Sequence, residues 1–476
     1  MRMTLTRLAV TVPLFAWATA SAARAEDVPE DQEKIVGHWQ GVLKFQGGSL
    51  RIVFHIAKKE GGGLTASLDS PDQAAKGLPV AAVGIRGQAV QLIADPADPN
   101  GMQFFGDLSA DGKAIVGKWK QGGQELPFTI EHTETPWEVK RQQEPKPPFP
   151  YNAEEVAIEN PAAKGVTLAG TLTLPKEGGP FAVILLITGS GAQDRNEEIF
   201  SHKPFLLLAD FLTRRGIAVL RLDDRGFAKS TGDFASATTA DFASDAKAAV
   251  EYLKTRKDID ATRIGLLGHS EGGIVAPMLA AETKDIAFMV LLAAPAVTGE
   301  ELLFAQAEAM LRLQGQPAQA LVQQRATQRK MFEIVKASKD KDDCLARLRE
   351  GFKEDLASPQ GKAMLEPQFV SLCSPWLRFF LTFDPATALK KVKCPVLALY
   401  GEKDTQVLAT QNGQPMETAL KAGGNTNVTV EGMKGLNHLF QMCKSGLIQE
   451  YATIEETINP AVLEQIGTWL DKVTKK

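Results

Sequence analysis

The stretch that decides the fold is Ile264-Gly265-Leu266-Leu267-Gly268-His269-Ser270-Glu271-Gly272-Gly273. Its first four residues form an apolar run typical of a buried strand, and a helical run, Ile274–Ala281, follows it. Between them lies a Gly-x-Ser-x-Gly segment centred on Ser270. In a strand–turn–helix context such a segment predicts a nucleophile elbow, because a tight turn that exposes the serine leaves no space for side chains two residues away. The alternative is an ordinary glycine-rich turn.

The elbow belongs to a longer alternation of strands and helices that begins near residue 151. A hairpin is expected over Val156–Pro175, and apolar runs then alternate with helical stretches such as Ala240–Lys257. The expected strands are Phe181–Ile187, Ile217–Leu222, Ile264–Leu267, Ile286–Ala293 and Val396–Tyr400. Continuous apolar runs suit parallel strands that are buried on both faces. The pattern therefore predicts a doubly wound α/β domain over residues 151–476.

Residues 298–388 interrupt this alternation. They contain no good strand and are rich in Ala, Leu, Gln, Lys and Glu, so we expect several helices inserted between two strands of the sheet. An insertion of this size at the end of a strand is well placed to cover a site.

A serine nucleophile needs a base, and the base needs an acid that orients it. Only His438 lies downstream of Ser270, in a loop after the expected last strand, 427–430. We expect the side chain of His269, which adjoins the serine, to point away from the exposed hydroxyl. The other histidines precede the serine (His38, His55, His132 and His202). Elimination and chain order therefore indicate His438 as the base, against the alternative of a solvated loop histidine.

The acid is expected between the serine and the histidine, at the end of a strand. The strand Val396–Tyr400 runs into the turn Gly401-Glu402-Lys403-Asp404, which offers two carboxylates. The residues themselves leave both Asp404 and Glu402 open, because the two lie in one turn.

The reaction at such a serine also needs N–H donors for the oxyanion of its transition state. One donor is expected to be the backbone of Glu271, directly after the nucleophile. The other is expected in the loop Thr188-Gly189-Ser190-Gly191, which follows the strand Phe181–Ile187. We select Ser190, with Gly191 as the alternative; a flexible loop would have no fixed geometry there.

The region before the hydrolytic motifs, residues 26–133, has the pattern of β structure. Apolar and polar residues alternate over 50–56 and 114–119, and turn signals such as Gly61-Gly62-Gly63 separate such runs. Short strands with frequent turns predict a small barrel or sandwich. Residues 134–150 carry five prolines among charged and amide residues, a composition that favours an extended linker.

The N-terminal segment, residues 1–25, has the pattern of a secretory signal. A basic head precedes a short apolar run, 8–18, and small residues end at Ala23-Arg24-Ala25. The run is too short to anchor the chain in a bilayer. We expect cleavage after Ala25, with cleavage after Ala22 as the lesser option, and a periplasmic or secreted protein with no stable membrane anchor.

Export would change both the net charge and the chemistry of the cysteines. Removal of the signal takes away three arginines and no acid, so the charge would fall from −4 to −7. An oxidising compartment permits disulfides. Cys344 and Cys373 flank one helical region, and Cys394 and Cys443 flank the region of the acid and base. Local pairing and reduced, buried thiols both stay open, because sequence does not fix the pairing.

Composition excludes several classes of protein. The chain has 476 residues, of which 44% are hydrophobic and 23% charged, as expected of a globular protein. With 53 Lys and Arg against 57 Asp and Glu, the chain has no global basic field that would attract nucleic acid. Four cysteines are too few for a disulfide scaffold and too widely spaced for a zinc cluster.

Two further charged segments follow strands of the expected sheet. Asp223-Asp224-Arg225-Gly226 either binds a charged substrate or holds Arg225 in a structural ion pair, and we favour the ion pair. For Asp194-Arg195, just past the oxyanion loop, the sequence likewise leaves both substrate binding and a structural ion pair as alternatives.

The second part of the chain, roughly residues 150–476, resembles bacterial α/β-hydrolase-fold carboxylesterases of the serine aminopeptidase-like, prolyl oligopeptidase-related group. The resemblance rests on Thr188-Gly189-Ser190-Gly191, Asp224-Arg225-Gly226, the elbow around Ser270, Gly401-Glu402-Lys403-Asp404 and Asn437-His438. The preceding β region resembles a domain that some exported esterases of this group carry. The resemblance implies a Ser270–His438–Asp404 triad, and so favours Asp404 over Glu402. It also implies a helical cap and hydrolysis of short-chain esters with no metal or cofactor.

The chain departs from many of these relatives at two positions. Thr188 stands where they have a histidine before the oxyanion residue, which changes the expected geometry of that loop. Gln406-Val407-Leu408 follows the acid where relatives often have prolines.

Three functions are compatible with these residues. The first is a serine esterase acting on a small-molecule ester. The second is a peptidase or amidase with the same triad, for which Glu271, Asp194 and Asp223 are the available amine-binding carboxylates. The third is an exported binding protein with an inactive hydrolase fold. The sequence leaves the acyl and alcohol groups, the oligomeric state and the role of the β domain open.

Overall fold

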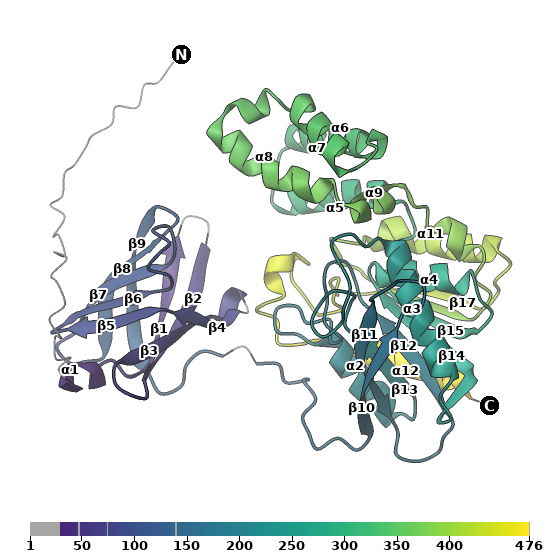
Figure 1. The fold of residues 1–476 in the computed structure, drawn as a ribbon, viewed down its shortest axis with the longest axis horizontal. Helices are drawn as coiled ribbons and strands as arrows, with labels where there is room; N and C mark the ends of the chain where they lie inside the picture. Colours follow the sequence, from purple (N-terminus) through teal and green to yellow (C-terminus); the bar gives the residue numbers. More distant parts are fainter. Residues whose placement is uncertain (1–28, 46–47, 74, 139, 476) are drawn as a thin grey trace. The chain divides into compact units, whose positions relative to one another are not determined.

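The computed structural model describes residues 29–45, 48–73, 75–138 and 140–475, so the expected signal segment lies outside the described residues. The chain divides into two compact units (Figure 1). The first unit ends at Trp137 and the second begins at Glu138, and the short segment Pro71–Ala75 is grouped with the second. Within the described ranges, no helix has the length and apolar content needed to cross a membrane.

The first unit is a nine-stranded, nearly closed antiparallel sheet in the order β4-β3-β2-β1-β9-β8-β7-β6-β5. After the short helix α1 (Pro29–Glu33), its strands are β1 (Gly37–Phe45), β2 (Gly48–Lys58), β3 (Leu64–Ser70), β4 (Ala75–Val80), β5 (Ala82–Arg86), β6 (Ala89–Ile93), β7 (Gln103–Leu108), β8 (Ala114–Gln121) and β9 (Gln124–Thr133). Its core is rich in aromatic side chains (Trp39, Phe54, Phe104, Trp119 and Phe128). The predicted small all-β region is confirmed, and its two alternating stretches lie in β2 and β8.

The second unit contains an eight-stranded sheet in the order β10-β11-β13-β12-β14-β15-β16-β17. Its strands are β10 (Asn152–Glu159), β11 (Thr167–Leu174), β12 (Phe181–Ile187), β13 (Ala218–Leu222), β14 (Ile259–His269), β15 (Ile286–Leu292), β16 (Val396–Gly401) and β17 (Val428–Met433). The hairpin β10–β11 is antiparallel, and β12 to β17 run parallel to one another. Every residue of β12 is buried, as a strand covered on both faces requires. The predicted α/β sheet is confirmed.

Several predicted strand boundaries differ from the structure, and the largest difference lies at the start of β14. The structure begins β14 at Ile259, ahead of the expected Ile264. The intervening residues Asp260–Arg263 are mostly polar and partly exposed, so the apolar pattern of a buried strand is missing there although the backbone stays extended.

Helices cover the sheet on both faces (Figure 1). They are α2 (Pro204–Arg214), α3 (Thr239–Lys254), α4 (Gly272–Ala280), α11 (Ala409–Ala422) and α12 (Pro460–Thr474). Helix α3 packs against α4, and α2 packs against α12. The start of α3 is fixed by Asp241, whose carboxylate accepts a hydrogen bond of 2.9 Å from the backbone N–H of Thr238.

Six helices lie between β15 and β16, where the sequence predicted a helical insertion. They are α5 (Gly299–Leu313), α6 (Ala318–Ala337), α7 (Lys341–Gly351), α8 (Pro359–Leu372), α9 (Pro375–Thr382) and α10 (Ala386–Leu389). We call these helices the cap. A disulfide joins Cys344 in α7 to Cys373 at the end of α8, while Cys394 and Cys443 are unpaired. Of the two local pairings left open by the sequence, only the one within the cap is formed.

The expected linker is tied to the second unit at its C-terminal half. The guanidinium of Arg141 donates hydrogen bonds to three backbone carbonyls, including that of Ile454 at 2.7 Å. The side chain of Gln143 donates to the carbonyl of Ile458 at 2.7 Å. The described residues of this segment form no helix or strand, and Arg141 and Gln143 bind it to the second unit.

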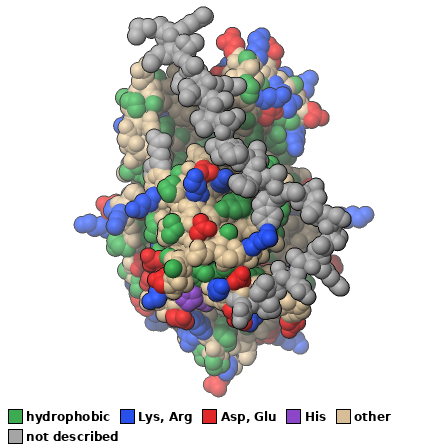
Figure 2. Space-filling model, turned by 90° about the vertical axis from the view of Figure 1, so that its left-hand side faces the viewer, with side chains coloured by type: hydrophobic (Ala, Val, Ile, Leu, Met, Phe, Trp, Pro, Cys, Tyr) green, Lys and Arg blue, Asp and Glu red, His purple; other side chains and the backbone are tan. Residues whose placement is uncertain are grey.

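The surface in Figure 2 mixes acidic and basic side chains. Lys and Arg are interspersed with Asp and Glu on the face that it draws, outside the residues in grey. No single-sign patch dominates this face, in keeping with the nearly balanced composition.

Candidate active site

The turn between β14 and α4 has the geometry of a nucleophile elbow. Ser270 has a φ of 51°, in the left-handed region that non-glycine residues seldom adopt. A Cβ built on Gly268 would lie 2.1 Å from the carbonyl oxygen of Gly272, and one built on Gly272 would lie 2.2 Å from that of Ile187. The collisions anticipated from the sequence are therefore present, and they explain both glycines. The N–H of Ser270 donates to the carbonyl of Leu292 at 2.9 Å, which fixes the turn against the neighbouring strand.

His438 and Asp404 lie in contact after the last two strands of the sheet. Nδ1 of His438 is 2.8 Å from Oδ2 of Asp404, and both side chains are almost fully buried. The other carboxylate oxygen of Asp404 accepts backbone N–H bonds from Gln406 at 2.7 Å and Val407 at 2.9 Å. Glu402 instead accepts from the N–H of Gly435 at 2.8 Å. Of the two candidate acids, the structure brings only Asp404 to His438.

His269 connects the elbow to the loop of His438. Its ring centroid is 4.8 Å from that of His438, and its Nε2 lies 3.1 Å from the His438 carbonyl oxygen. Its Nδ1 is 2.9 Å from Glu197. Burial lowers the pKa of His269, but the Glu197 carboxylate, the carbonyl of His438 and the charge of Asp404 together raise it above the ordinary value. The contact with the His438 carbonyl joins His269 to the backbone that carries His438.

The predicted oxyanion loop lies directly beside the nucleophile. A Cβ built on Gly189 would lie 3.2 Å from Cβ of Ser270. The N–H of Gly189 is already engaged, because it donates to Glu197 at 2.8 Å. Within the described part of the chain, the N–H groups of Ser190 and Glu271 have no acceptor. These two predicted donors are therefore available to an oxyanion.

Thr188, which departs from the histidine of many relatives, is held by Asp224. Its hydroxyl donates to Oδ1 of Asp224 at 2.7 Å, and the N–H of Gln193 donates to Oδ2 at 2.9 Å. Burial raises the pKa of Asp224 to about 7 despite these donors. The threonine thus gives the loop a side-chain anchor of its own.

Comparison with known proteins agrees with this geometry. The family model described as serine aminopeptidase, S33 matches residues 202–442, about half of the chain. The chain belongs to the serine aminopeptidase S33 family. The family assignment and the eight-stranded sheet together make the second unit an α/β-hydrolase fold.

Individual relatives of this S33 family member are distant. Esterase EstD of Thermotoga maritima is 27% identical over 308 residues, which span 64% of this chain and 66% of that protein. The Pyrococcus furiosus esterase Pf2001 is 19% identical, with a TM-score of 0.42 over 68% of this chain and 94% of the other. Est1E from Butyrivibrio proteoclasticus, solved with ferulic acid bound, is 18% identical, with a TM-score of 0.40 over 67% and 100% of the two chains. At these TM-scores the two structures add nothing to the family assignment.

The side chain of Glu271 forms a cluster that the sequence did not reveal in this S33 family member. Its carboxylate is buried and accepts hydrogen bonds from the hydroxyl of Thr239 at 2.6 Å and the indole N–H of Trp376 at 2.7 Å. The hydroxyl of Ser190 lies near enough to the same carboxylate to lower its pKa. Burial is the larger influence and raises the pKa of Glu271, and Thr239, Trp376 and Ser190 only partly oppose it. The sequence identified Glu271 only for its backbone, because nothing local links it to a tryptophan of the cap.

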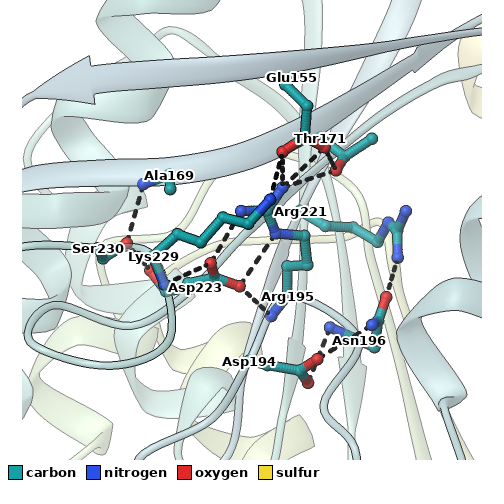
Figure 3. Close-up of polar contacts among 10 residues, drawn as sticks. All are labelled: Glu155, Ala169, Thr171, Asp194, Arg195, Asn196, Arg221, Asp223, Lys229 and Ser230. Carbon is teal, nitrogen blue, oxygen red and sulfur yellow. Dashed lines mark hydrogen bonds and ion pairs between the residues drawn. The ribbon is translucent and has the colours of Figure 1, made fainter.

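The arginines of the two charged segments that were ambiguous in the sequence form ion pairs, and Figure 3 shows the pair of Arg195 with Asp223. Arg195 binds Asp223 through Nε and Nη2, at 3.0 and 2.8 Å, and also reaches Glu155. Arg225 binds Asp245 through the same two nitrogens, at 2.6 and 2.8 Å, so the favoured structural reading of Arg225 is confirmed. Oδ1 of Asp194 accepts the backbone N–H groups of two residues that follow it. These contacts fix the strand ends and loops behind the elbow.

Metal ligation has no support in the described ranges. No group of three or more His, Cys, Asp or Glu side chains among those residues is placed to hold a metal ion.

Proposed function

We propose that this protein is an exported serine carboxylesterase that hydrolyses short-chain esters through an acyl-enzyme. The observation that carries the proposal is the contact of His438 with Asp404, together with the positive φ of Ser270 at the elbow. Family membership supplies the reaction class, and the elbow, base and acid occur in the chain order that an α/β-hydrolase uses.

The geometry supports the following sequence of steps. Oγ of Ser270 attacks the ester carbonyl carbon while Nε2 of His438 takes the hydroxyl proton. Asp404 accepts from Nδ1 of the base, which keeps the ring in the tautomer that leaves Nε2 free to receive that proton. The tetrahedral intermediate collapses, the C–O bond to the alcohol breaks, and His438 returns the proton to the leaving oxygen. Water then attacks the acyl-serine by the same route and releases the acid.

Negative charge on the carbonyl oxygen needs donors that are already in place. The N–H groups of Ser190 and Glu271 are proposed for this role, because both are unengaged while the neighbouring N–H of Gly189 is occupied. Asp224 and Glu197 hold the loop from behind, so the donors need little rearrangement when the charge develops.

Ester hydrolysis is favoured over peptidase action by the state of the acidic side chains. An aminopeptidase needs a carboxylate that is free to bind the substrate amine. The three candidates are all occupied: Asp223 by Arg195, Asp194 by backbone N–H groups, and Glu271 by neutral donors. The curated relative is named as an esterase, and this chain spans 66% of its length. Export is proposed on the signal-like pattern of residues 1–25.

Turnover of p-nitrophenyl esters of increasing acyl length by the mature protein tests the function. Ser270→Ala should lower kcat for p-nitrophenyl acetate by about 10⁵-fold or more, because the nucleophile is lost while the fold is kept. The same variant should no longer react with a fluorophosphonate probe. Undiminished turnover by the variant would remove Ser270 from the mechanism, and faster turnover of aminoacyl-amides than of esters would favour the peptidase.

A further inference from the structure

The carboxylate of Glu271 joins three segments that are far apart in the sequence. Thr239 is the first residue of α3, Ser190 lies in the oxyanion loop, and Trp376 lies in cap helix α9. Thr239 and Trp376 donate to the carboxylate, the Ser190 hydroxyl lies near enough to it to lower its pKa, and Glu271 itself directly follows Ser270. One side chain therefore connects the cap, the oxyanion loop and the elbow.

Stability does not explain why a carboxylate occupies this place. The side chain of Glu271 is only 2% exposed, and among the described residues no lysine, arginine or histidine donates to it. A buried carboxylate without a cationic partner loses more hydration than neutral donors return, so an apolar residue of the same size would be cheaper. A residue that is unfavourable for stability at its own position is expected to serve the reaction.

The first three residues of the oxyanion loop each lie against a different acidic side chain. Thr188 donates to Asp224, the N–H of Gly189 donates to Glu197, and the hydroxyl of Ser190 lies near Glu271. Asp224 and Glu197 belong to the sheet side of the site. Glu271 differs because it also contacts the cap, so the position of Ser190 alone depends on where α9 lies.

The cap side of this contact is firmly packed. The indole of Trp376 stacks on Phe380 with ring centroids 5.0 Å apart, and Phe380 is buried. A Cβ built on Gly299, the first residue of α5, would lie 2.3 Å from the Phe380 ring, so α9 packs closely on the start of α5. Helix α5 is the next element after β15, so packing through Phe380 and α5 connects the position of Trp376 to the sheet.

We propose that Glu271 is a positioning residue that couples cap helix α9 to the oxyanion loop, so that seating of Trp376 sets the Ser190 N–H where the oxyanion forms. The proposal rests on the esterase function proposed above. In this proposal Trp376 and the Ser190 hydroxyl act through the same carboxylate, and Thr239 holds that carboxylate against helix α3. The coupling acts on the transition state, and therefore on kcat more than on KM.

Four variants of the full mature chain separate this device from simple packing. Glu271→Met keeps the volume and removes the acceptor, and Glu271→Gln keeps an acceptor for the indole. Trp376→Phe and Ser190→Ala each remove one donor. Trp469→Phe, in α12, is the matched control for loss of an indole outside the site. Each variant is measured for kcat and KM with p-nitrophenyl acetate and for its unfolding temperature.

Glu271→Met should lower kcat by about 10- to 100-fold with KM changed by less than about threefold, because a donor displaced by a fraction of an ångström loses most of its effect. Glu271→Gln should recover most of that loss. Trp376→Phe should lower kcat by about tenfold in the native background, and by less than about twofold in the Glu271→Met background, since the shared contact is already gone. Trp469→Phe should behave as wild type.

The outcomes that would overturn the coupling differ from those that would overturn the function. If Trp376→Phe lowers kcat by the same factor with and without Glu271→Met, the indole acts independently and the coupling is wrong. The coupling would also be overturned if kcat fell across the variants only in proportion to the fall in their unfolding temperatures, because a general loss of packing would then explain both. If Glu271→Met fails to fold, the double variant Trp376→Phe/Ser190→Ala takes its place. A fall in kcat equal to the product of the two single-variant falls would then overturn the coupling. A wild-type protein that neither turns over esters nor reacts with fluorophosphonate would overturn the esterase function, and the coupling with it.

Discussion

The two sides of the elbow are built in different ways. On the acid–base side, Asp404 is held by backbone N–H groups of its own turn and by the one histidine that it orients. On the oxyanion side, Glu271 is held only by side chains, which come from α3, the oxyanion loop and the cap. Both carboxylates are buried, yet their partners differ in kind.

This difference separates chemistry that is assembled locally from chemistry that depends on the whole domain. Backbone N–H groups in a tight turn stay in place whenever the turn forms, so the acid–base side tolerates change elsewhere. Donors from three segments keep their geometry only while the cap and sheet stay packed. We therefore expect the acid–base side to respond to substitutions in an all-or-none manner, and the oxyanion side to respond in a graded one.

The largest effect is expected from Asp404→Asn. An amide cannot hold His438 in the tautomer that accepts the serine proton, so kcat should fall by about 10³- to 10⁴-fold. Glu402→Gln is the matched control from the same turn, and it should change kcat by less than about twofold because Glu402 contacts only a backbone N–H. Ester kinetics on both variants measure the contrast. Equal losses of kcat in the two variants would contradict the choice of Asp404 over Glu402 as the acid.

Glu197→Gln tests the one side chain that serves both sides of the elbow. Its carboxylate accepts from the N–H of Gly189 and pairs with His269, which in turn holds the backbone of His438. The amide keeps the volume and removes the charge, so kcat should fall by about 10- to 100-fold. The pKa of His269 should fall as well, since Glu197 is what raises it. A titration of the histidine ring resonances by NMR measures this, and an unchanged His269 titration would contradict the assignment.

The smallest effect is expected from Asp224→Asn, and it concerns stability. The folded-state pKa of Asp224, about 7, lies above the ordinary value of 3.8, so the folded protein binds this proton more tightly than the unfolded chain. Stability from this group is therefore lost as the pH rises from about 4 to 7. The variant should not lose this stability as the pH rises. It does lose one acceptor for the Gln193 N–H, so we expect a net gain over wild type of about 1–2 kcal/mol in the free energy of unfolding at pH 8.

Urea unfolding of both proteins at pH 5 and pH 8 measures the effect of Asp224→Asn. The urea concentration at the unfolding midpoint should be higher for the variant than for wild type, and this difference should be larger at pH 8 than at pH 5. Parallel changes with pH would show that Asp224 does not carry the proton.

Much of the fold and half of the site follow from local patterns. The strands from Phe181 to Tyr400 are visible because a parallel strand covered on both faces must be apolar throughout, and the start of β14 was missed because Asp260–Arg263 are mostly polar and partly exposed. The elbow is visible because its glycines are required by collisions within a few residues. Asp404 and Glu402 could not be separated, since a turn of four residues does not state which carboxylate faces a histidine 34 positions away.

The sequence by itself determined the two-part organisation, the helical insertion and the elbow, and it selected His438 as the candidate base. Those features depend on periodicity, composition and chain order, which are properties of neighbouring residues. Tertiary structure alone decided the Cys344–Cys373 pairing, the bracing of His438 by His269, and the meeting of Glu271 with Trp376 across 105 positions of the chain. The physical reason is that a buried hydrogen bond between distant residues leaves no local signature, because each partner by itself fits an ordinary helix or loop.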